Sequence, residues 1–273
     1  MHESPDGWRP VFDHEQMLRS RETWVYDAHW EELAQVQCPA LVVRGLDGEL
    51  GRAEAQEMVR VLPRGAYALS APLGAIYASV ALLLIGSTTE IFVPYFLQLL
   101  HGHSPLAAGY LTAAMAGGWS AGSLLSSGRS GAGADRMLRA GPLATTLGLV
   151  ALALLLPFPG HLGAGFETAL VAVALAIVGL GVGIGWPHLV TRVLSLAPKG
   201  EEGLASASIT TIQLYGMAVG AAVAGLVANA AGLTLPGGAE GAQSAAVWLF
   251  TSFALAPALA VLLAYRVVAV RGW

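Results

Sequence analysis

Glu90 is the residue whose setting most directly suggests chemistry, because it lies inside the apolar run LLLIGSTTEIFVPYFLQLL. A carboxylate in lipid is costly, so it must be protonated, be paired or face a wet cavity. About ten residues, or roughly 15 Å of helix, separate it from the end of the run, which places it near mid-membrane. One interpretation is a proton or cation coupling site, or a solute contact. The other is a hydrogen bond to Ser87, Thr88 or a neighbouring helix, with no role in transport.

Prolines and glycines mark places where the helices must bend or pack closely. Pro94 follows Glu90 by four residues, and its ring opposes the Glu90 carbonyl, so we expect a kink there. Glycine recurs at every second position of GLGVGIGWP, at Gly179, Gly181, Gly183 and Gly185, just before Pro187. A dinucleotide loop needs a preceding strand, so this mid-span run indicates close packing or a gating bend. Gly216 and Gly220 share one helix face and predict a packing surface.

Other motifs carry little chemistry. Ser120 lies in a G-x-S-x-G pattern, but a hydrolase elbow needs a strand, a strained turn and a helix, whereas this pentapeptide lies in an apolar helical stretch. His101 and His103 form a potential metal pair without an evident third ligand, and Cys38 is the single cysteine. We therefore expect no metal site, no cofactor and no enzymatic activity.

Six long apolar stretches position these residues. They cover residues 71–100, 105–126, 138–156, 166–196, 204–231 and 244–268. About 20 helical residues cross a bilayer's hydrocarbon, and lipid forces each segment to satisfy its own backbone amides. The sequence therefore predicts a mainly α, polytopic membrane protein with a six-helix bundle. The net charge of −4 averages two dissimilar regions and gives no indication of nucleic-acid binding.

Charge divides the chain into two predicted domains, residues 1–65 and 66–273. The first holds 7 Arg and 12 Asp or Glu, and the second holds 7 basic and 6 acidic residues over three times the length. The basic residues of the second domain all fall in alternate turns: Arg129, Arg136, Arg139, Arg192, Lys199, Arg266 and Arg271. By the positive-inside rule these turns are cytoplasmic. We expect a multi-pass cell-membrane protein with both termini in the cytoplasm.

Residues 1–65 form a different kind of sequence. CPALVVRG, residues 38–45, predicts a short buried strand, followed by a turn and an amphipathic helix. The run from His29 to Gly65 resembles the late part of an α/β-hydrolase, in which a strand ends in Gly-x-Asp, and Asp47 matches the position of the triad acid. No nucleophile elbow precedes Asp47, so it is interpreted as a vestige. A fragment this small cannot bury a sufficient core and is expected to be incomplete.

Residues 66–273 resemble the C-terminal half of a major facilitator superfamily transporter, most like bacterial drug:proton antiporters of the inner membrane. Three segments carry the resemblance: EIFVPYFLQLLHGHSPLAAGYL, GAGADRMLRAG and EGLASASITTIQLYGMAVGAAVAG. The second matches the family's cytoplasmic loop motif at Gly131, Asp135, Arg136 and Arg139, although Leu138 replaces a family glycine. The resemblance implies that Asp135, paired with Arg136 or Arg139, helps to lock one conformational state. The alternative is simple positive-inside anchoring.

The resemblance also implies transport of a small organic solute, perhaps by proton-coupled efflux, with the lipid bilayer as surroundings. Transporters of this family place substrate between two six-helix halves. A single half would need a second bundle, either a second copy of this chain or a separate N-terminal-half chain. The alternatives are a non-transporting or inactive membrane protein from a fused or truncated reading frame, and a membrane-tethered hydrolase, which the missing elbow disfavours.

Overall fold

The computed structural model describes residues 2–4, 7–9, 31, 72–197 and 202–269. By internal contacts the chain divides into two units, Met1–Gly65 and Ala66–Trp273. In the first, β1 (His2–Ser4) pairs antiparallel with β2 (Gly7–Arg9), with His2 opposite Arg9. The predicted strand at 38–45, the helix after it and Asp47 lie outside the described residues.

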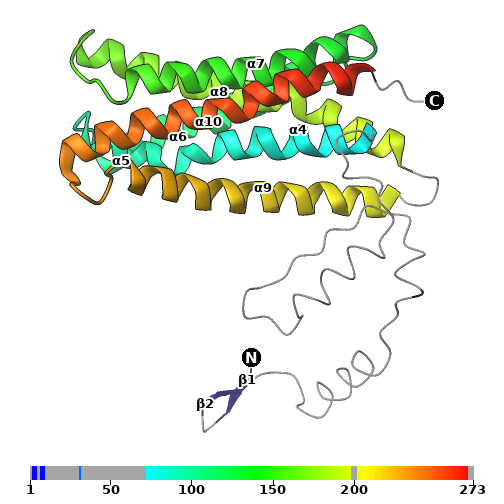
Figure 1. Cartoon of the computed structure of the whole chain (residues 1–273), viewed down its shortest axis with the longest axis horizontal. Helices are drawn as coiled ribbons and strands as arrows, with labels where there is room; N and C mark the ends of the chain where they lie inside the picture. The colour runs from blue at the N-terminus through cyan, green and yellow to red at the C-terminus, as the bar shows by residue number, and fades with distance from the viewer. Residues whose placement is uncertain (1, 5–6, 10–30, 32–71, 198–201, 270–273) are drawn as a thin grey trace. The chain divides into compact units, whose positions relative to one another are not determined.

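The second unit is a bundle of long helices (Figure 1). The first run joins α4 (Pro72–Ser87), the 3-10 helix η1 (Thr88–Phe92) and α5 (Val93–Leu99). The others are α6 (Pro105–Ser126), α7 (Ala132–Leu155), α8 (Ala164–Leu196), α9 (Glu202–Ala230) and α10 (Gly238–Ala269). The chain is therefore a mainly α, polytopic membrane protein, as its apolar stretches predict.

Among the described residues, five helical runs are long and apolar enough to cross a membrane: Leu73–Leu99, Ala132–Leu155, Ala164–Leu196, Ala205–Ala230 and Gly238–Ala269. The sequence predicted six spans, and the exception is α6. It has 22 residues and no charged side chain, but its four glycines and four hydroxyl-bearing residues lower its hydropathy.

Contacts at the two ends of the bundle show how far α6 extends. His101, just before α6, bonds the carbonyl of Leu156 at the end of α7, whereas Asp135, in the first turn of α7, bonds Arg192 at the far end of α8. The start and the end of α7 therefore lie at opposite ends of the bundle. Because α6 connects His101 to the start of α7, it runs the length of the bundle beside the five apolar runs.

The interior consists of two apolar clusters, one toward each end. Phe96, Leu149 and Phe250 belong to the cluster nearer His101. Ile76, Leu83 and Val193 belong to the cluster nearer Arg192. Burial of these side chains and the close approach of glycine-bearing helices fix the bundle, as expected where lipid offers no hydrophobic driving force between helices.

Candidate functional site

The helix that carries Glu90 changes geometry at that residue. Pro94 has no N–H to donate, and residues 88–92 form the 3-10 helix η1, with the Val93 N–H donating to the Glu90 carbonyl. The hydroxyls of Ser87, Thr88 and Thr89 donate to backbone carbonyls of the preceding turn, at 2.8, 2.7 and 3.1 Å. The predicted disturbance of the helix is confirmed as this 3-10 turn.

The Glu90 side chain projects from the bundle rather than into it. The residue is exposed, whereas Thr88 and Thr89 are buried. Over residues 72–197 and 202–269, the Glu90 carboxylate forms no hydrogen bond and no ion pair. The hydroxyls of Ser87 and Thr88 are used by their own backbone, so the alternative interpretation of Glu90, with one of these as its partner, does not hold.

Glu90 shares its surface with polar and aromatic side chains of the same run. Ile91 is 58% exposed and Tyr95 is 42% exposed. Gln98 is also exposed and donates to the Pro94 carbonyl at 3.0 Å. This surface of Glu90, Ile91, Tyr95 and Gln98, here called the Glu90 face, combines a carboxylate, a phenol and an amide. It can bind a cation or a polar solute.

The glycines of α8 meet three different neighbours. A Cβ atom at Gly179 or Gly183 would overlap a backbone carbonyl of α6, at Met115 and Trp119 respectively. A Cβ atom at Gly181 would overlap the hydroxyl of Thr145 on α7. Gly185 is different, since its nearest contact would be Leu83 at 4.0 Å.

These contacts account for three of the four alternating glycines through close packing. The α8 helix continues from Ala164 to Leu196 without interruption, with Pro187 inside it. On α9, Gly220 lies against Thr88 and Ile85, and Gly216 lies 3.3 Å from Ala81 when measured from a built Cβ atom. The paired glycines of α9 therefore lie beside the helix that carries Glu90.

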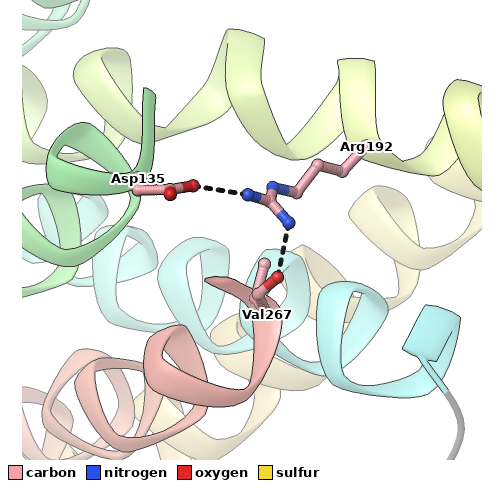
Figure 2. A network of polar contacts seen from close by, with 3 residues as sticks. All are labelled: Asp135, Arg192 and Val267. Atoms are coloured by element: carbon pink, nitrogen blue, oxygen red, sulfur yellow. Dashed lines mark hydrogen bonds and ion pairs between the residues drawn. The ribbon is translucent and has the colours of Figure 1, made fainter. Parts of the chain in front are cut away.

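Asp135 joins three helix ends. Its carboxylate accepts a hydrogen bond from the Arg192 guanidinium at 2.6 Å, and a second nitrogen of Arg192 donates to the Val267 carbonyl at 2.6 Å (Figure 2). Asp135 lies in the first turn of α7, where a negative charge is favourable. The implied pairing of Asp135 with Arg136 or Arg139 is wrong, because both arginines are exposed and Arg192 reaches the carboxylate from α8.

The described charges are distributed unequally between the two ends of the bundle. All arginines of residues 72–197 and 202–269 lie at the end that contains the start of α4, the α6–α7 turn and the end of α10, here called the arginine end: Arg129, Arg136, Arg139, Arg192 and Arg266. The opposite end holds Glu167 and Glu240 with three histidines, His101, His103 and His161.

Glu167 has a structural role that the sequence did not reveal. Its carboxylate accepts hydrogen bonds from the backbone N–H groups of Gly160 and Leu162, each at 2.8 Å, and so holds the α7–α8 turn. His103 bonds Thr168 at 3.1 Å. No cluster of three or more metal-ligating side chains occurs among the described residues. Ser120 lies in the middle of α6, not on a strand-to-helix turn.

Two curated proteins are similar to this chain. Each is named a probable multidrug-efflux transporter, one from Mycobacterium tuberculosis strain CDC 1551 / Oshkosh and one from strain H37Rv. Each is 35% identical over 208 residues, which make up 76% of this chain and 42% of the relative. The chain thus spans less than half the length of these relatives, and no family model matches it. The chain is a helical membrane protein with transporters, not enzymes, as its reported relatives.

Proposed function

We propose that the helical unit is one half of a major facilitator transporter that exports small organic solutes in exchange for protons. Its relatives are named for multidrug efflux, and the helices provide the membrane-spanning bundle that such a role needs. The hydrolase-like part of residues 1–65 has no assigned step in this scheme.

The observation that carries the proposal is the Glu90 carboxylate. It lies nine residues from the end of the Leu73–Leu99 run, on the outside of the bundle and without a partner among the described residues. An isolated carboxylate is not stable against lipid, so this face must meet water, a solute or another protein surface. A water-filled cavity would let Glu90 take up a proton on one side of the membrane and release it on the other.

Such a cavity needs an opposite wall. Transport by alternating access rocks one bundle against another around a site near mid-membrane. The second bundle can belong to a second copy, to a separate chain or to a longer form of this chain. The Glu90 face is the surface of α4–α5 left uncovered within the described bundle, and it is the wall that we assign to the cavity.

The arginine end would face the cytoplasm, by the positive-inside rule. There the Asp135–Arg192–Val267 contact holds the ends of α7, α8 and α10 together. Opening of the cytoplasmic side would loosen these ends relative to the second bundle. We assign the loop motif Gly131, Asp135, Arg136 and Arg139 to this step through Asp135, with Arg192 as its partner.

Flux measurements test the proposal. The whole chain in proteoliposomes, with a second bundle if one is identified, should couple the export of a fluorescent lipophilic cation to proton entry. Glu90→Gln keeps the size of the side chain but cannot exchange a proton, so proton-coupled flux should fall at least tenfold. Glu240→Gln, an equal change of charge at an exposed helix start, should leave flux within twofold. Equal flux from wild type and Glu90→Gln would remove Glu90 from the mechanism.

A further inference from the structure

The arginine end has basic side chains that no protein group neutralises within residues 72–197 and 202–269. Arg136 and Arg266 are exposed and form no ion pair or hydrogen bond in these ranges. Arg139 lies with its guanidinium carbon 5.1 Å from the centre of the Tyr265 ring. A cation over an aromatic face keeps its N–H groups available to an anion. Arg192, by contrast, is occupied by Asp135 and Val267.

These arginines come from two adjacent helices. Arg136 and Arg139 are three residues apart on α7, and Tyr265 and Arg266 are on the last turn of α10. The contact of Arg139 with Tyr265 brings the two helices together at this point, and Figure 1 shows α7 and α10 running side by side. The basic groups therefore form one cluster at the seam of α7 and α10, here called the α7–α10 cluster.

An apolar surface continues from the cluster along both helices. The α7 helix exposes Leu143, Leu147 and Leu154 at spacings of four and seven residues from one another, and α10 exposes Leu255, Leu259 and Leu262. Each is between 49% and 68% exposed. Residues at such spacings lie on one helix face, so each helix presents one apolar strip that ends at an arginine.

We propose that the α7–α10 cluster is a binding site for an anionic diacyl phospholipid. The phosphodiester would bind Arg139 and Arg266, with Arg136 and the Tyr265 hydroxyl beside it, and the acyl chains would lie on the two leucine strips. Guanidinium groups bind phosphate through paired N–H donors. A phenol at the membrane interface adds a further donor to the same headgroup. The site is separate from the Glu90 face and does not depend on the proposed function.

The combination of chemistry selects a lipid over a soluble phosphate. A free phosphate would use the arginines but would leave the leucine strips without a role. A neutral lipid would use the strips but would leave the arginines unneutralised. An anionic phospholipid satisfies both, and the position of the cluster at the end of the membrane-spanning helices matches the depth of the headgroups.

Native mass spectrometry of the purified whole chain tests the site. The protein is taken from micelles that contain equal amounts of phosphatidylglycerol and phosphatidylcholine, and the lipids retained are counted. We expect preferential retention of phosphatidylglycerol. Arg139→Gln and Arg266→Gln should each weaken retention about fivefold, the equivalent of about 1 kcal/mol for one arginine near an anionic headgroup. Tyr265→Leu keeps the apolar contact and should weaken retention to a smaller extent.

Arg129→Gln is the matched control, because Arg129 is exposed at the same end but lies on the α6–α7 turn and bonds Leu125 there. It should retain phosphatidylglycerol as wild type does. Equal loss in Arg129→Gln would show a general effect of surface charge and overturn the site, as would equal retention of the two lipids by wild type. Displacement of the lipid by millimolar inorganic phosphate would also contradict it. Should Arg139→Gln not fold, as judged by circular dichroism, Arg266→Gln decides the question.

Discussion

A single ion pair, Asp135 with Arg192, connects residues that lie 57 positions apart in the chain. The motif around Asp135 showed that this carboxylate matters but pointed to the wrong cation. Arg136 and Arg139 are near in sequence, yet a helix turns them away, toward the exposed surface. The partner comes from another helix, and sequence spacing carries no information on such a contact.

Removal of this pair should loosen three helix ends at once. Arg192→Gln leaves Asp135 without its cation and Val267 without its charged donor, so the unfolding free energy should fall by about 1 to 3 kcal/mol. Arg192→Lys keeps the charge but has no planar fork to bridge both acceptors, and should restore part of the loss. Thermal unfolding of the purified protein in detergent measures both. A midpoint for Arg192→Gln equal to that of wild type would mean that the contact does not hold the ends.

At the scale of elements, apolar stretches located the helices but not their ends. The stretch predicted at 138–156 corresponds to α7, which begins six residues earlier, at Ala132. The stretch at 244–268 corresponds to α10, which begins at Gly238. Helices continue beyond the hydrocarbon, where polar side chains are tolerated, so hydropathy indicates the bilayer and not the backbone. The low hydropathy of α6 has a related cause, since its glycines and hydroxyls serve contacts with α8.

The packing of α6 on α8 makes a prediction with an internal control. Gly183→Ala would place a methyl group on the Trp119 carbonyl, and the helices would have to separate. Gly185→Ala, two residues away on the same helix, adds the same methyl group where the nearest atom is 4.0 Å distant. We expect Gly183→Ala to cost about 1 to 3 kcal/mol through overpacking, and Gly185→Ala to unfold as wild type does. Equal midpoints in thermal unfolding would count against glycine-mediated contact.

At the scale of the whole molecule, the bundle has one basic end and one end with histidines and carboxylates. The alternation of arginine-bearing turns predicted this separation from the sequence, and the described residues bear it out. It holds only if α6 runs the length of the bundle, as the contacts at its two ends require. Which end faces the cytoplasm follows from the positive-inside rule and remains a prediction.

Labelling of single cysteines tests the orientation. The only cysteine, Cys38, is first replaced by serine. Ser130→Cys then reports on the arginine end and His161→Cys on the opposite end, and both positions are exposed. In intact cells a membrane-impermeant maleimide should label position 161 and not position 130, and inside-out vesicles should reverse the result. Labelling of both positions from one side would contradict a bundle that spans the membrane in this way.

The account rests on water, rather than lipid, at the Glu90 face, and the accessibility of position 90 tests this most directly. In the Cys38→Ser background, Glu90→Cys is compared with Leu147→Cys, a position 58% exposed on α7 that should face lipid. A hydrophilic maleimide added to membranes that contain the whole chain should label position 90 and leave position 147 unlabelled. Equal, negligible labelling at both positions would place Glu90 against lipid or a dry interface and contradict the central claim.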